Sequence, residues 1–156
     1  MTPQPIRIAL IGTAARTSYM YHHLLAAMPD RFEVVALWGR SAAKTQSMAA
    51  SLGLPAYTDL DRLIRETAPQ AGLVCVGYSG NGEAGRMAVE AGLHCLMETP
   101  IAHRLEEADQ IIRIAEQKNL KVEVAEQFHR RPLEQIKLKL IEEGWFGKIS
   151  TSFNDF

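Results

Sequence analysis

A turn near the start of the chain contains residue types that can bind a phosphate group. The apolar run 6–12 leads into the segment Gly12-Thr13-Ala14-Ala15-Arg16-Thr17. In a dinucleotide-binding turn, one glycine makes the tight bend, a second lets the backbone approach the pyrophosphate and a third lets the helix pack on the strand. Only Gly12 is kept here, with Ala14 and Thr17 in the other two places. We expect the main-chain amides of Gly12, Thr13 and Ala14 to face a pyrophosphate, with the charge of Arg16 beside it. The alternative is a strand–helix turn without a ligand, in which Arg16 is solvated.

A second group of residues with binding chemistry follows the apolar run 33–38. The segment there is Trp38-Gly39-Arg40-Ser41. NAD-binding domains place an acidic residue near this point to bind the ribose hydroxyls, and this segment has none. Arg40 can stack on an adenine or bind a 2′-phosphate through two hydrogen bonds, and the Ser41 hydroxyl can add another. The pattern therefore favours NADP over NAD as the cofactor. The alternative is that Arg40 only begins a solvated helix, with Ser41 as its N-cap.

The elements that must position these groups alternate along the chain. Short apolar runs typical of buried strands cover residues 6–12, 33–38, 72–77, 94–98 and 121–125, with a short extended piece at 55–58. Amphipathic stretches typical of helices cover residues 17–28, 41–52, 59–66, 82–91, 105–118 and 132–143. Continuous apolar strands separated by helices predict an α/β fold, a doubly wound parallel sheet with both faces covered.

Composition excludes several classes of partner. The net charge of −1, with 47% hydrophobic and 22% charged residues, is that of an ordinary globular domain and predicts no nucleic-acid or membrane partner. No basic segment with a following apolar stretch predicts a signal peptide at the N-terminus, and no run approaches the roughly 20 apolar residues that span a bilayer. Cys75 and Cys95 lie in apolar runs, which favours buried reduced thiols in a cytoplasmic protein. Adjacent His22 and His23 point in different directions on a helix, so we expect no metal site.

Four later segments, together with the Gly12 turn, resemble one known family over essentially the whole chain. They are Ala91-Gly92-Leu93-His94, Met97-Glu98-Thr99-Pro100, the run 126–132 (EQFHRRP) and the run 143–149 (EGWFGKI). Their order is similar to that of the glucose–fructose oxidoreductase, inositol dehydrogenase and rhizopine catabolism family, Gfo/Idh/MocA. The resemblance implies a Rossmann NAD(P)-binding domain over residues 1–147. It also implies that residues 148–156 form the first strand, or the start, of a C-terminal α/β domain that is otherwise largely absent, and that homo-oligomers form through that domain.

The resemblance also implies a reaction and a set of residues for it. Family members transfer a hydride between a nicotinamide and a hydroxyl- or carbonyl-bearing carbon of a sugar, polyol or related small molecule. The family has Glu-Lys-Pro after the fifth strand, and its lysine assists proton transfer; here Thr99 stands in that place. A threonine hydroxyl is a poor acid or base near neutral pH. His129 is therefore our first candidate for the proton, because imidazole moves protons readily in that range. Its alternative is a surface histidine beside two arginines.

The remaining site predictions concern the nicotinamide end of the cofactor. Glu98 is expected near the nicotinamide ribose or amide, with Thr99 beside it as a further candidate catalytic residue; the alternative for Glu98 is a strand-end carboxylate that caps a neighbouring helix. Tyr78, in the loop after the fourth strand, and Gln127 are expected to contact the cofactor. Three functions remain open: an NAD(P)-dependent oxidoreductase, which is favoured; an NAD-dependent glycosidase or epimerase; and a dinucleotide- or ligand-binding regulatory protein that lost catalysis, for which Thr99 is the supporting feature. We expect the 156-residue chain alone to be inactive.

Overall fold

The computed structural model describes residues 4–152, and the chain divides into two compact units between Ala125 and Glu126. The first unit holds a six-stranded sheet in the order β3-β2-β1-β4-β5-β6, in which every neighbouring pair is parallel. The strands are β1 (Ile6–Ile11), β2 (Phe32–Trp38), β3 (Ala56–Tyr57), β4 (Ala71–Val74), β5 (His94–Met97) and β6 (Val122–Val124). The strand order reverses at β1, which pairs with β2 on one side and β4 on the other. Ligands of open α/β sheets bind at the carboxyl edge beside such a reversal.

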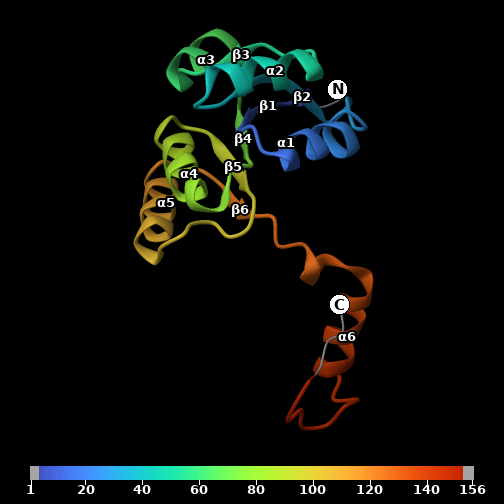
Figure 1. Cartoon of the computed structure of the whole chain (residues 1–156). Helices are drawn as coiled ribbons and strands as arrows, with labels where there is room; N and C mark the ends of the chain where they lie inside the picture. The colour runs from blue at the N-terminus through green and yellow to red at the C-terminus, as the bar shows by residue number, and fades with distance from the viewer. Residues whose placement is uncertain (1–3, 153–156) are drawn as a thin grey trace. The chain divides into compact units, whose positions relative to one another are not determined.

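Helices cover both faces of this sheet. They are α1 (Ala15–Met20), which continues as the π-helix η1 (Tyr21–Leu25), α2 (Ala42–Leu52), α3 (Leu60–Thr67), the 3₁₀ turn η2 (Tyr78–Gly80), α4 (Asn81–Glu90) and α5 (Leu105–Gln117). In Figure 1, α1 lies on one side of the sheet and α4 and α5 lie on the other. The predicted doubly wound α/β sheet is confirmed.

The two faces have separate apolar cores because side chains alternate along a strand. From β1, Ala9 and Ile11 join the cluster that contains the buried residues of α3, α4 and α5. Ile8 and Leu10 join the cluster that contains those of α1, η1 and α2. These four side chains are at most 8% exposed. A strand that is apolar on both faces is therefore buried by helices on both faces, which explains the continuous apolar runs in the sequence.

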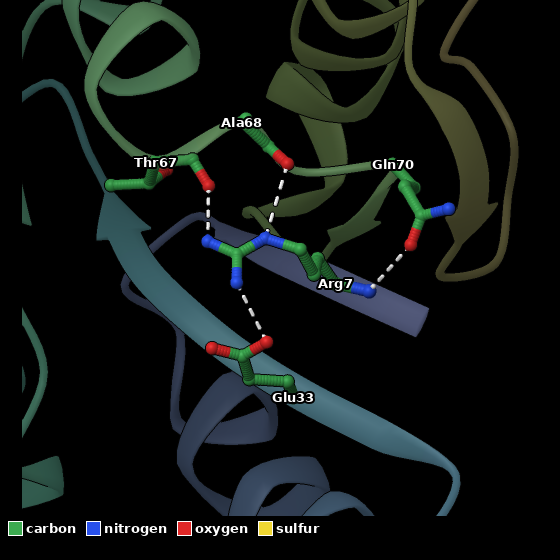
Figure 2. Close-up of polar contacts among 5 residues, drawn as sticks. All are labelled: Arg7, Glu33, Thr67, Ala68 and Gln70. Carbon is green, nitrogen blue, oxygen red and sulfur yellow. Dashed lines mark hydrogen bonds and ion pairs between the residues drawn. The ribbon is translucent and has the colours of Figure 1, made fainter. Parts of the chain in front are cut away.

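The amino edge of the sheet is held by Arg7, the second residue of β1 (Figure 2). Its guanidinium donates to Glu33 Oε2 on β2 at 2.7 Å, and to the carbonyl oxygens of Thr67 and Ala68 at 2.6 and 3.3 Å. The backbone N–H of Arg7 donates to Gln70 Oε1 at 3.0 Å. Thr67 and Ala68 are the last residue and the C-cap of α3, so a cation meets the free carbonyls at a helix C-terminus. This edge is opposite the predicted binding site, and its contacts are structural.

One predicted element differs from the structure, and one stays untested. The helix expected over residues 17–28 begins at Ala15 and changes to π-helix at Tyr21. It begins early because the Thr17 N–H already donates to Ala14 O, at 2.9 Å. The strand, or start of a further domain, expected over residues 148–156 stays a prediction: residues 148–152 lie in neither strand nor helix, and residues 153–156 fall outside the described range. A strand needs a neighbour to accept its backbone hydrogen bonds.

The second unit contains the 3₁₀ turn η3 (Phe128–Arg130) and the helix α6 (Pro132–Glu142). Pro132 occupies the first turn of α6, where its missing N–H costs no hydrogen bond. Apolar side chains of α6 are exposed, namely those of Leu133, Ile136, Leu138 and Ile141. The domain boundary at residue 147 that the resemblance implies stays a prediction. Within residues 4–152 no helix has the length and apolarity to cross a membrane.

Candidate functional site

A cleft opens at the carboxyl edge of the sheet, where the segments after β1, β2 and β4 meet. Its volume is about 390 Å³. Five of the predicted cofactor-binding residues line it, namely Gly12, Thr13, Ala14, Arg40 and Ser41. Lys44, Val76 and Gly77 line it as well. The strand order thus brings together two segments that the sequence separates by about 25 residues, as expected from parallel strands whose carboxyl ends share one edge.

Gly12 is required by the backbone and by its surroundings. Its φ is +115°, which L side chains rarely adopt. A Cβ at this position would lie 2.2 Å from the carbonyl oxygen of Cys75 and 2.6 Å from Cγ1 of Val76. Its N–H donates to Trp38 O at 2.8 Å. The turn after β1 therefore lies directly against the end of β4, and no side chain fits between them.

The second and third glycine positions of the dinucleotide-binding turn are occupied here by Ala14 and Thr17, and each makes a different local structure. Thr17, in the third, is fully buried and its hydroxyl donates to Cys75 O at 3.1 Å, so a hydrogen bond joins α1 to the end of β4. Ala14, in the second, is the N-cap residue of α1 and has extended backbone angles. It provides no side-chain acceptor for the first N–H groups of the helix. The Thr17 N–H donates to Ala14 O, and an anion is an acceptor that suits the other N–H groups at this helix start.

The segment after β2 carries both of its predicted binding residues, and one of them has a protein partner. Arg40 Nη1 lies 3.2 Å from Glu83 Oε2, in an ion pair that is more than half exposed at both ends. Ser41 occupies the N-cap position of α2, but its hydroxyl makes no capping hydrogen bond. The backbone N–H and the hydroxyl of Thr45 both donate to Ser41 O, at 2.9 and 2.7 Å. The helix start is thus held through the Ser41 carbonyl, which leaves its hydroxyl for other partners.

Glu98, at the end of β5, is held by two hydrogen bonds. Arg16 Nε donates to its Oε1 at 2.5 Å, and the Thr99 N–H donates to its Oε2 at 3.1 Å. The Glu98 side chain is 19% exposed and that of Arg16 is 47% exposed. The hydrogen bond to Glu98 raises the pKa of Arg16, although burial acts in the opposite direction, so the guanidinium stays charged. The sequence predicts Arg16 beside the phosphates; in the structure this side chain joins the first turn of α1 to the end of β5.

Asn81 supports this arrangement, although sequence reasoning did not assign it a role. Its side chain is 1% exposed. Its Nδ2 donates to the carbonyl oxygens of Glu98 and Pro100, at 2.8 and 2.9 Å. Its Oδ1 is buried and has no hydrogen-bond partner among the described residues. A polar residue at the start of a helix is ordinarily interpreted as a cap, so the sequence carries no signal for this long-range contact.

The remaining predicted residues have surroundings of their own. Tyr78 is 61% exposed, and its ring meets that of His103 edge-on with centroids 5.1 Å apart. Gln127 and His129 belong to the second unit; the Nε2 of His129 accepts from Arg130 Nε at 3.3 Å. Their roles, like that of the Thr99 hydroxyl, stay predictions. In the part of the chain that the structure describes, no group of three or more His, Cys, Asp or Glu side chains is placed to hold a metal ion.

Comparison with known proteins agrees with this geometry. The sequence model of an oxidoreductase family with an NAD-binding Rossmann fold, Gfo/Idh/MocA, matches residues 6–126. An uncharacterized oxidoreductase of Schizosaccharomyces pombe is 29% identical over 93% of this chain and 40% of its own length. D-xylose dehydrogenase of Paenarthrobacter nicotinovorans is 26% identical over 97% of this chain and 42% of that enzyme.

One solved structure shows the same fold. It is the WlbA dehydrogenase of Bordetella pertussis in complex with NADH and UDP-GlcNAcA, which has a TM-score of 0.84 at 24% identity. The match covers 96% of this chain and 43% of the WlbA chain. This chain therefore spans about two fifths of the length of these relatives.

Proposed function

Because this chain belongs to the Gfo/Idh/MocA oxidoreductase family, we propose that it is the dinucleotide-binding domain of an NAD(P)-dependent oxidoreductase that acts on a sugar, a polyol or a related small molecule. The observation that carries the proposal is the cleft beside Gly12, at the carboxyl edge where the strand order reverses. Gly12 packs on the carbonyl of Cys75, and a side chain at position 12 would push the turn away from the end of β4. A sugar-type substrate is supported by relatives such as D-xylose dehydrogenase.

The residues present suit a dinucleotide. A bound nicotinamide cofactor would supply the hydride-transfer chemistry that side chains lack. The uncapped N–H groups at the start of α1 suit the pyrophosphate. Ser41, with its hydroxyl outside any capping bond, suits the adenosine ribose. Glu98, fixed by Arg16 and by the Thr99 N–H, suits the nicotinamide end, since a carboxylate with two donors is held in one orientation.

The preferred cofactor in this proposal is NADP. No acidic residue stands between the end of β2 and the first turn of α2, so a 2′-phosphate meets no repulsion from that segment. Arg40 and Lys44 add two positive charges to the lining of the cleft. His129 remains the proposed proton donor or acceptor, with Glu98 and Thr99 as further candidates, because no lysine follows Glu98.

Titration of the 156-residue chain with NADPH and with NADH, followed by calorimetry, tests the proposal. We expect both to bind and NADPH to bind at least about threefold more tightly, a difference of roughly 0.7 kcal/mol. Preference for NADH would refute the choice of NADP. Failure of both dinucleotides to bind would refute the function itself.

A second candidate function is favoured by Thr99. A regulatory relative that binds a dinucleotide without turnover does not need the lysine expected after Glu98. In such a protein both carboxylate oxygens of Glu98 would have a structural role, because they accept from Arg16 and from the Thr99 N–H. Tight dinucleotide binding without reduction of NADP or NAD, by the longest natural form of the protein in the presence of sugars and polyols, would favour this candidate.

A further inference from the structure

Two positively charged side chains, Arg40 and Lys44, line the cleft, and one of them is paired with a carboxylate. Arg40, between β2 and α2, lies 3.2 Å from Glu83 in the first turn of α4. Its Nη2 also lies 3.3 Å from the point where a Cβ at Gly80 would stand. The guanidinium therefore rests against the start of α4, and its charge is met by a carboxylate. An anion that approached Arg40 would have to approach Glu83 as well.

Lys44 is in a different situation. It is the third residue of α2, it is exposed, and no ion pair joins it to a carboxylate within residues 4–152. It lines the cleft of about 390 Å³ and also an adjoining groove of about 540 Å³. Thr13, in the turn after β1, is the other residue that both share. Lys44 thus lies where the cleft and the groove adjoin.

Apart from Lys44, the groove is lined by hydroxyl-bearing and apolar residues and carries no other charge. Ser18 from α1 and Ser47 from α2 line it together with Lys44, and its other lining residues are also uncharged. A phosphate that projects from the ribose out of the cleft and into this groove would meet one cation and several hydroxyl groups. A lysine serves such a dianion as a compact point charge with three donors.

We propose that Lys44 is the residue that sets a preference for NADPH over NADH, and that Glu83 restrains Arg40 from that role. The inference rests on the proposed function, because it concerns the same dinucleotide. Arg40 keeps its place as one wall of the cleft, while Lys44 and the Ser41 hydroxyl bind the 2′-phosphate. The carboxylate of Glu83 acts against the phosphate, so the preference in the native chain is smaller than two free cations would produce.

Single substitutions in the 156-residue chain test the assignment, with dissociation constants measured for NADPH and NADH at the same low salt concentration. Lys44→Gln is expected to weaken NADPH binding about tenfold, the loss of one charge-assisted hydrogen bond, and NADH binding less than about twofold. Glu83→Gln is expected to strengthen NADPH binding about threefold, with little change for NADH. Lys121→Gln is the matched control, because this exposed lysine precedes β6 at the opposite edge of the sheet; both constants should stay unchanged.

The outcomes separate this inference from the proposed function. A wild-type chain that binds neither dinucleotide overturns both. A chain that binds both dinucleotides but has the same preference before and after Lys44→Gln overturns the inference and leaves the proposed function standing. The inference alone also fails if Lys44→Gln weakens NADH binding as much as NADPH binding, or if Arg40→Gln by itself abolishes the preference.

Discussion

Substitution of Gly12 by alanine tests the central geometric claim, that the turn after β1 packs directly on the end of β4. The added Cβ would stand 2.2 Å from the Cys75 oxygen, so the two backbones would have to separate by about 0.8 Å to reach the 3.0 Å that real Cβ contacts respect. The interior is close-packed and yields little. A strained backbone costs about 1–3 kcal/mol and overpacking costs about 1–3 kcal/mol more. The sum, about 2–6 kcal/mol, is a large part of a typical stability of about 5–15 kcal/mol.

Two other glycines supply controls that separate strain from overlap. Gly53, the C-cap of α2, has φ of +69°, and an added Cβ would have nothing within 4 Å, so Gly53→Ala should cost only the backbone strain, about 1–2 kcal/mol. Gly77 has φ of −65° and open space around it, so Gly77→Ala should be neutral or stabilising by up to about 1 kcal/mol.

Urea unfolding of the three variants and the wild type gives the free energies to compare, provided that the slopes of the transitions agree. The expected order of stability is Gly77→Ala, then Gly53→Ala, then Gly12→Ala. Gly12→Ala should also weaken dinucleotide binding more than Gly53→Ala, because the turn must move and Gly53 does not line the cleft. If Gly12→Ala is no less stable than Gly53→Ala, the close approach to Cys75 is not a constraint and the reasoning fails.

Three further predictions concern groups around the sheet. Asn81→Leu should destabilise the chain by about 2–3 kcal/mol, because two carbonyl oxygens of the loop after β5 lose their donor; a change in unfolding free energy below about 0.5 kcal/mol would contradict this. Arg7→Gln should cost about 1–2 kcal/mol and Glu33→Gln less than about 1 kcal/mol, since the arginine also binds the end of α3; any loss of dinucleotide affinity would argue against a purely structural role at the amino edge. Burial raises the pKa of Cys75 and of Cys95 to about 12, with the charge of a nearby carboxylate adding to the effect at Cys75. Because unfolded thiols ionise near pH 9 while folded thiols hold their protons, stability should fall from about pH 9 to about pH 12 by roughly 1.4 kcal/mol per pH unit for each thiol; labelling of the native chain by a thiol reagent at pH 8 would show that the thiols are not buried.

Local pattern was enough to predict the layered fold and the turn. Strands buried on both faces are apolar along most of their length, so the five apolar runs predicted strands without reference to a partner strand. The helix ends also depend on local residues: Asp59 accepts from the Arg62 N–H as the N-cap of α3, and Gly53 takes the left-handed conformation after α2. The prediction of buried cysteines is also confirmed. These features depend on residues within a few positions of each other.

The partners of the charged groups could not be predicted in that way. Arg16 and Glu98 are 82 positions apart, and Arg40 and Glu83 are 43 apart. Nothing near either arginine in the sequence indicates which carboxylate it meets. The strand order decides this, because it sets β1 between β2 and β4 and gathers their carboxyl ends at one edge.

The sequence by itself therefore determined which segments are strands and helices, where the chain bends at Gly12, and which residue types stand at the strand ends. Only the tertiary structure decided which of those residues keep a free charge: Arg16 and Arg40 are paired, whereas Lys44 is not within the described residues. The physical reason is that backbone conformation follows from neighbours along the chain, while electrostatic pairing follows from distance in space.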